Sequence, residues 1–177
     1  MNKFLSLACI LFLFACNSKT DAPMDEVAVV EVPAAEIGDG AHIESAKAGL
    51  AALSSGVLDA WFDQFADDAM YRFNNGDSLA GKAAIVDYWT KRRGEDITAI
   101  SFANDIWLPV KVNTPANEMQ APGDWLLGWY QVTATYKSGK SMTQWIHTDQ
   151  HYNADGKVDI VIQYLDRASI MAAQSGK

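Results

Sequence analysis

Residues 141–152, S-M-T-Q-W-I-H-T-D-Q-H-Y, can be read as one β-strand. Successive side chains of a strand point to opposite faces of its sheet, so Trp145, His147, Asp149 and His151 share one face. Two of the three histidines of the chain lie in this stretch. We therefore expect the domain to be built around this strand, with a pocket on the face that carries the histidines.

Further strands are expected at 97–112, 125–136 and 157–166. Ser138-Gly139 fits a two-residue hairpin loop, and such a loop would place Tyr130 opposite His147. One face of the sheet would then combine apolar and titratable side chains, namely Leu126, Tyr130, Val132, Trp145, His147, Asp149, His151, Ile160, Ile162, Tyr164 and Asp166. An apolar surface with a few polar groups is typical of a small-molecule pocket.

Helices are expected before these strands, because apolar residues recur at helical spacing in 43–53, 57–65 and 82–93. A short strand at 69–73 should separate the second helix from the third. The basic run Lys91-Arg92-Arg93 suits the C-terminal end of the third helix and is expected to be exposed to solvent.

The first fifteen residues have the outline of a secretory signal peptide, with Lys3, an apolar run and a small residue, Ala15, at the end. The sequence L-F-A-C at 13–16 resembles the lipobox of bacterial lipoproteins. This resemblance implies that Cys16 becomes the first mature residue and carries a diacylglyceryl group and an N-acyl chain such as palmitate. The alternative is an ordinary signal peptide.

Removal of residues 1–15 leaves 13 basic and 22 acidic residues, a net charge of −9. An acidic chain without a basic cluster argues against binding to nucleic acid, and it leaves the lipid as the only expected membrane contact. Residues 16–41 are small and polar and are expected to form a flexible tether, with a short strand at 27–32 as the alternative. The domain is expected at 42–177, outside the cytoplasm and anchored in the bacterial cell envelope.

The order of these elements resembles the nuclear transport factor 2-like fold, and three stretches resemble its SnoaL-like branch. They are F-A-D-D-A-M-Y-R-F at 65–73, L-A-G-K-A-A-I at 79–85 and A-D-G-K-V-D-I-V-I-Q-Y-L-D at 154–166. The resemblance implies an α+β domain whose cone-shaped, curved antiparallel sheet packs on three N-terminal helices around a pocket. The family includes isomerases, dehydratases, polyketide cyclases, epoxide hydrolases and non-catalytic domains, so the fold does not fix the function.

The catalytic residues of the family can be carried over only in part. The carboxylate base of ketosteroid isomerase would fall at 72–74, which reads Arg-Phe-Asn. SnoaL-type cyclases use a His and an Asp from the later strands, which implies His147 or His151 together with Asp166. From the residues themselves, His147, Asp149 and Asp166 are the candidates for acid–base catalysis. Contacts to a ligand are expected from Tyr71, Tyr130, Trp145, His147, His151, Ile162 and Tyr164.

Three functions follow from these residues and stay open. We expect the domain to bind a small, largely apolar molecule; the alternatives are an acid–base enzyme and a dimerising interaction module. No metal or other cofactor is expected, because His147 and His151 lie ~13 Å apart along an extended strand and cannot bind the same ion. A homodimer is left open.

Overall fold

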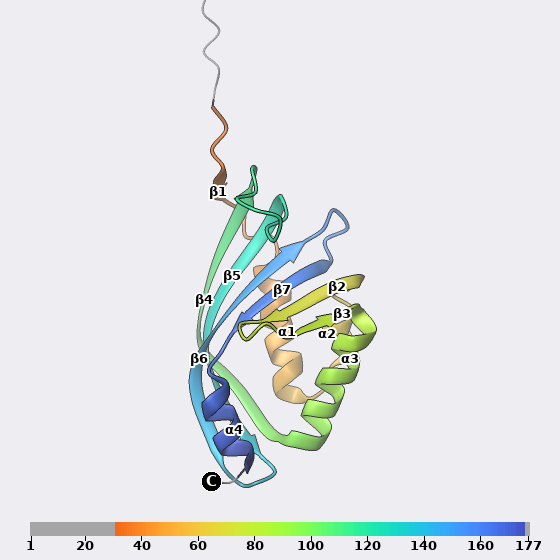
Figure 1. Ribbon diagram of the computed structural model, residues 1–177, viewed down its shortest axis with the longest axis vertical. Helices are drawn as coiled ribbons and strands as arrows, with labels where there is room; N and C mark the ends of the chain where they lie inside the picture. The colour runs from red at the N-terminus through yellow and green to blue at the C-terminus, as the bar shows by residue number, and fades with distance from the viewer. Residues whose placement is uncertain (1–30, 176–177) are drawn as a thin grey trace, which may run out of the picture. The chain divides into compact units, whose positions relative to one another are not determined.

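The computed structural model describes residues 31–175, and residues 32–175 belong to one compact unit (Figure 1). Its sheet has seven strands in the order β1-β4-β5-β6-β7-β2-β3. The strands are β1 (Ala35–Ile37), β2 (Phe65–Phe73), β3 (Ser78–Ala80), β4 (Ile97–Val112), β5 (Gly123–Tyr136), β6 (Ser141–Tyr152) and β7 (Val158–Tyr164). The helices are α1 (Ile43–Ser55), α2 (Asp59–Phe62), α3 (Lys82–Lys91) and α4 (Arg167–Ser175), and a π-helical turn, η1 (Arg92–Asp96), follows α3.

The α+β class and the curved sheet over N-terminal helices are confirmed. The sheet is mixed rather than antiparallel, because β2 pairs with β7 in parallel. The structure adds β1, β3 and α4, which the sequence analysis did not predict. Strand β1 lies inside the range expected to be a tether, and its Ala35 pairs with Val112 of β4.

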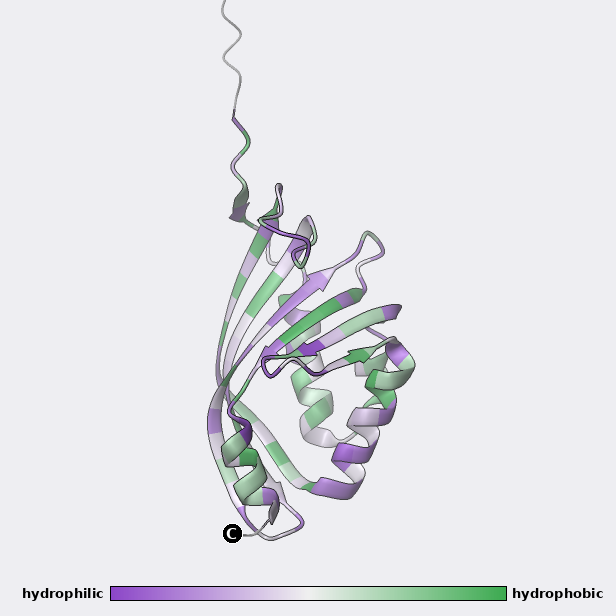
Figure 2. Cartoon of the chain, viewed as in Figure 1, coloured by the Kyte–Doolittle hydropathy of each residue, from purple (hydrophilic) through white to green (hydrophobic). Residues whose placement is uncertain are grey.

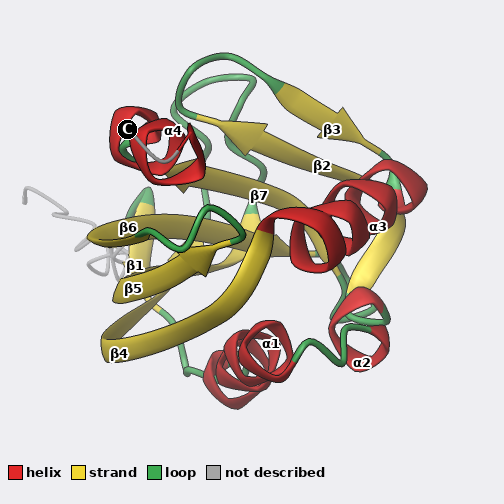
Figure 3. Cartoon of the chain, turned by 90° about the horizontal axis from the view of Figure 1, so that it is seen from below, coloured by secondary structure: helices red, strands yellow, loops and turns green. Residues whose placement is uncertain are grey.

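A bulge in β4 helps to bend the sheet. The register between β4 and β5 shifts between Ala103 and Ile106, and Asn104 has a φ of 56°. Such a bulge inserts an extra residue, which bends the strand and increases its twist. In Figure 1 the long strands β4, β5 and β6 curve along their length, and in Figure 3 α1, α2 and α3 lie together on one side of them. The bend gives the sheet an inner face that α1–α3 cover.

The loop between β5 and β6 sets which residues reach that inner face. The Tyr136 amide donates to the Lys140 carbonyl, so the loop has three residues, 137–139, and not the predicted two. Gly139, with a φ of 80°, supplies the left-handed residue that a three-residue loop requires. Tyr130 therefore lies opposite Ile146 instead of His147, and the predicted register between β5 and β6 is wrong by one residue.

Two groups of buried side chains form the core. One joins α1–α3 to β2 and β7 and includes Trp61, Phe65 and Ile85. The other lies between α4 and the hairpin of β5 and β6 and includes Val132 and Ile146. Figure 2 shows hydrophobic and hydrophilic residues alternating along the long strands, as expected for a sheet with one buried face.

The N-terminal predictions concern residues that the structure does not describe. The signal peptide, the lipobox with Cys16 and most of the alternative strand at 27–32 lie before residue 31. Within residues 31–175, no helix is long and apolar enough to cross a membrane.

Candidate functional site

A cavity of about 120 Å³ lies on the inner face of the sheet and is lined by residues of both core groups. Each helix and each of the strands β2, β4, β5, β6 and β7 contributes to the lining. Its walls are mainly aromatic and aliphatic side chains, including Trp61, Tyr71, Phe102, Val132, Ala134 and Ile146. A cavity of this size is comparable with one that accepts a benzene-sized molecule.

One polar group of the wall lies where β5, β6 and β7 run side by side. The hydroxyls of Tyr130 and Thr148 are 2.8 Å apart and share a hydrogen bond, and the Gln163 amide is near enough to the Tyr130 hydroxyl to influence its pKa. Burial nevertheless raises the pKa of Tyr130, and it raises that of Tyr71, also in the cavity wall, well above its usual value. Both phenols therefore stay neutral at physiological pH and can donate a hydrogen bond.

Several buried polar atoms of the wall lack a partner. Among residues 31–175, four buried side-chain nitrogen or oxygen atoms have no hydrogen-bond partner, and three of them line this cavity. They are Trp89 Nε1, the Tyr136 hydroxyl and Gln163 Oε1. A buried polar group without a partner costs roughly 1–3 kcal/mol, so such groups are uncommon away from binding sites. Ordered water or a bound molecule can complete the hydrogen bonds of such groups.

Charged groups of the cavity wall are arginines. Arg92 of η1 and Arg167 of α4 line the cavity, whereas no Asp, Glu or His of the described residues does. Arg167 is paired with Asp77, whose Oδ2 lies 2.7 Å from its Nη1. Hydrogen bonds from Asn75 and from Arg167 hold the pKa of Asp77 below its usual value. The cavity therefore offers hydrogen-bond donors, neutral acceptors and positive charge, but no carboxylate or imidazole for proton transfer.

The structure divides the predicted ligand contacts into two sets. Tyr71 and Tyr130 line the cavity. The other five lie outside its wall, because the one-residue change of register sends them to the outer face of the sheet, namely Trp145, His147, His151, Ile162 and Tyr164. The relation of β6 to β7 is as expected, since His147 pairs with Tyr164 and Asp149 with Ile162.

The candidate catalytic residues also lie away from the cavity. His147 stacks on Trp129, with ring centres 4.4 Å apart, and its Nδ1 donates to the Gly128 carbonyl. Its Nε2 is 2.9 Å from Asp149 Oδ1. Asp166 accepts a hydrogen bond from the Ala168 amide at the start of α4. None of His147, Asp149 and Asp166 lines the cavity.

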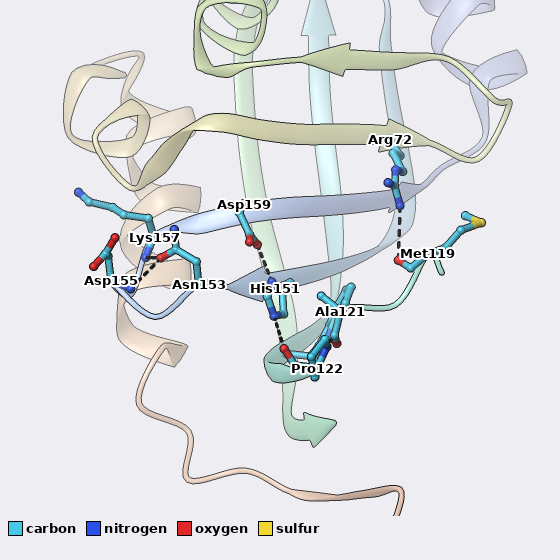
Figure 4. A network of polar contacts seen from close by, with 10 residues as sticks. Arg72, Met119, Ala121, Pro122, His151, Asn153, Asp155, Lys157 and Asp159 are labelled. Atoms are coloured by element: carbon cyan, nitrogen blue, oxygen red, sulfur yellow. Dashed lines mark hydrogen bonds and ion pairs between the residues drawn. The ribbon is translucent and has the colours of Figure 1, made fainter. Parts of the chain in front are cut away.

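His151 is a structural residue at the edge of the outer face (Figure 4). Its side chain is buried, with Nδ1 2.5 Å from Asp159 Oδ1 and Nε2 3.0 Å from the carbonyl oxygen of Pro122. Both ring nitrogens of His151 therefore have a polar partner within hydrogen-bond distance. The Trp125 indole donates a hydrogen bond to the carbonyl of Ala121, the residue before Pro122. Two side chains, those of His151 and Trp125, therefore hold the end of the loop between β4 and β5.

Sequence reasoning missed Arg92, Thr148 and Gln163 as cavity residues. The basic run 91–93 was expected to be exposed, yet only Lys91 is; Arg93 donates to the carbonyls of Leu53 and Ile97. Thr148 and Gln163 alternate with the residues that were assigned to the pocket, so the correct loop length would have placed them inside. In residues 31–175, no group of three or more His, Cys, Asp or Glu side chains is placed to hold a metal ion.

Comparison with known proteins supports the fold without naming a function. No protein-family model matches the chain, and no curated protein matches its sequence. Among solved structures, an NTF2-like protein of unknown function from Burkholderia pseudomallei is 12% identical, covers 76% of this chain and 97% of its own, and has a TM-score of 0.60. A candidate SnoaL-like polyketide cyclase from Jannaschia sp. CCS1 is 15% identical over 77% of this chain and 92% of its own, with a TM-score of 0.58.

An LEH-like epoxide hydrolase from M. tuberculosis is also similar, at 15% identity over 75% of this chain and 88% of its own, with a TM-score of 0.53. Proteins with these different descriptions share the curved sheet, the helices on its inner face and little sequence. At such identities the likeness establishes the fold alone. The domain has the nuclear transport factor 2-like fold.

Proposed function

We propose that the domain binds a small, largely apolar molecule that carries hydrogen-bonding groups. The observation that supports this most directly is the gathering of Trp89 Nε1, the Tyr136 hydroxyl and Gln163 Oε1, all buried and unpartnered, around one apolar cavity. Ligand pockets of proteins have this composition, with apolar walls that supply affinity and few polar groups that fix orientation. An acid–base enzyme is the weaker reading, because the cavity wall has no carboxylate or imidazole.

Native mass spectrometry of the unit 32–177, purified gently from its own host, tests the proposal. This unit contains every helix and strand of the structure and both core groups, so it can be studied alone. We expect a co-purifying small molecule, and its loss from a variant with a filled cavity, Ala134→Leu. Retention of the molecule by the filled variant would place its site elsewhere on the protein.

Gln163→Leu provides a second test, on stability. Leucine lacks the carboxamide and so removes the desolvation cost of the buried, unpartnered oxygen. The free energy of unfolding of the free protein should therefore not fall, whereas ligand binding should weaken. Gln131→Leu is the matched control, because Gln131 lies on the outer face and bonds to Asn104. A large loss of stability in Gln163→Leu would contradict the idea that this oxygen awaits a ligand.

We also propose that Cys16 anchors the protein in the bacterial cell envelope, on the strength of the L-F-A-C sequence at 13–16. Metabolic labelling with radioactive palmitate is expected to label the wild-type protein and not Cys16→Ser. The variant should also leave the membrane fraction, since the lipid is the proposed anchor. Labelling of Cys16→Ser would refute lipidation at this residue.

A homodimer through the outer face of the sheet is our third proposal. Two rows of side chains cross the strands there: Ile106, Trp129, His147 and Tyr164, and beside them Leu108, Leu127, Asp149 and Ile162. Trp145 and Tyr164 are about half exposed, at 52% and 45%. Exposed apolar and aromatic side chains that adjoin on one face are typical of a protein interface.

A further inference from the structure

We propose that the molecule bound in the cavity carries a negatively charged group such as a carboxylate, held by the Arg92 guanidinium and the Tyr136 hydroxyl. This inference rests on the proposed function, because it takes the cavity as the binding site. It adds the charge of the ligand and the end of the cavity at which the charged group lies.

Arg92 lines the cavity, and its guanidinium has few partners within the protein. It begins the π-helical turn η1, and its side chain is only 16% exposed. Within the described chain its one ion-pair partner is Asp96, whose Oδ2 is 3.8 Å from Nη1, beyond hydrogen-bond distance. The adjacent Arg93 shows the contrast, because two backbone carbonyls accept hydrogen bonds from its guanidinium. The hydrogen bonds of Arg93 thus stabilise the fold, whereas Arg92 has N–H donors left that can bind a ligand.

Tyr136 of β5 stands beside Arg92 in the wall. It is 2% exposed, and its hydroxyl has no hydrogen-bond partner of good geometry. Burial raises the pKa of Tyr136. The charge of Arg92 and a hydrogen-bonding contact from its side chain partly oppose the rise, whereas Asp96 and Tyr88 add to it. The hydroxyl therefore remains protonated, and it can donate to the same acceptor that the guanidinium holds. A guanidinium and a phenol together suit the oxygens of a carboxylate, to which charged donors bind strongly.

The surroundings favour an anion at this place. Arg167, the other arginine of the wall, is 2.7 Å from Asp77 and has its charge compensated. The protein as a whole has a net charge of −8, so an arginine kept in an apolar cavity is not explained by a generally basic surface. A largely buried guanidinium in apolar surroundings gains far more from an anion than an exposed lysine does, because solvent screens it less.

The rest of the wall defines the remainder of the ligand. Val132 and Ala134 lie between Tyr136 and Tyr130 on the inner face of β5 and provide an apolar floor. With a volume of about 120 Å³, the cavity suits a body of about one ring or a short branched chain. The expected class is therefore a small aromatic or branched aliphatic carboxylic acid.

A matched pair of probes, 3-phenylpropanoate and 3-phenylpropan-1-ol, isolates the charge. Their affinities for the unit 32–177 are measured at pH 7 by following the methyl signals of Met142 and Ile146 by NMR, with Ile162 of the outer face as the control signal. We expect both probes to shift the cavity signals and the acid to bind about tenfold more tightly, as one charge-assisted hydrogen-bond pair allows.

Three variants assign the preference to Arg92 and Tyr136. Arg92→Gln should remove the preference for the acid and leave the affinity for the alcohol unchanged, and Tyr136→Phe should reduce the preference. Lys91→Gln is the control, because it removes the same charge from an exposed neighbour that pairs with Asp87. Loss of the preference in Lys91→Gln as well would show a general effect of charge and overturn the assignment.

Asp96→Asn tests the inference with Arg92 in place. The variant keeps an acceptor for the 3.3 Å hydrogen bond from Gln174 and removes the carboxylate that competes for the guanidinium. The acid should bind more tightly and the alcohol equally well; an unchanged affinity for the acid would overturn the inference. Equal wild-type affinities for both probes would also overturn it, while leaving the cavity as a binding site. Failure of both probes to shift the cavity signals would remove the proposed function together with the inference.

Discussion

His151 and His147 lie on the same face of β6, yet we expect them to contribute differently to the free energy of unfolding, because their surroundings differ. Both nitrogens of the buried His151 ring hold acceptors, the Asp159 carboxylate and the Pro122 carbonyl. We expect His151→Ala to lower the free energy of unfolding by roughly 2–4 kcal/mol, because it removes a buried ring and leaves the Asp159 carboxylate and the Pro122 carbonyl without this partner. His147→Ala, measured in the same urea titration, should cost about half as much or less. Equal losses would contradict the structural role of His151.

Asp149 predicts a dependence of stability on pH. Burial raises the pKa of Asp149, and the charge of His147 offsets part of the rise. Because the folded state then binds the proton more tightly than the unfolded state, this contribution to stability is complete below the usual carboxyl pKa and is lost as the pH rises through the raised one. Asp149→Asn should remove that loss, so the stability of the variant relative to wild type should increase from pH 3 to pH 7. A constant difference over this range would show that Asp149 titrates normally.

The hairpin between β5 and β6 shows where an element can be predicted and where it cannot. The strands were located almost to the residue, because apolar and polar side chains alternate along them. Lys137-Ser138-Gly139, however, is compatible with loops of two or three residues, and a change of one residue turns every side chain of a strand to the other face. For this reason the sequence led to Tyr130 and to the fold, but placed His147 in the cavity instead of Thr148.

Gly139 is the residue of that loop on which the observed register depends. Its φ of 80° is unfavourable for other residues, so Gly139→Ala should lower the free energy of unfolding by about 1 kcal/mol. Gly94→Ala in η1 is the control: no atom lies within 4 Å of the added methyl group, and the conformation is helical. It should leave stability unchanged or raise it by about 0.5–1 kcal/mol. The comparison is made by thermal unfolding, and a harmless Gly139→Ala would contradict the three-residue loop.

For the whole molecule, the proposed homodimer makes a prediction about mass. Light scattering of the unit 32–177 should give twice the mass of one chain, and Trp145→Glu should give the mass of a single chain with an unchanged circular dichroism spectrum. The reason is that a charge placed in an apolar interface loses its water on association. Lys111→Glu, at the end of β4 and away from Trp145, is a charge-changing control. A wild-type mass of one chain would refute the dimer.

Strand β1 covers the outer edge of the last residues of β4, through the pairs Ala35–Val112, Glu36–Lys111 and Ile37–Val110. An uncovered strand edge is a template on which another chain can add itself. A version of this protein shortened to residue 42 would keep the cavity and yet present free backbone groups along β4. Such a version should be prone to aggregate on storage, and the few residues of β1 would then matter less for folding than for keeping neighbouring molecules apart.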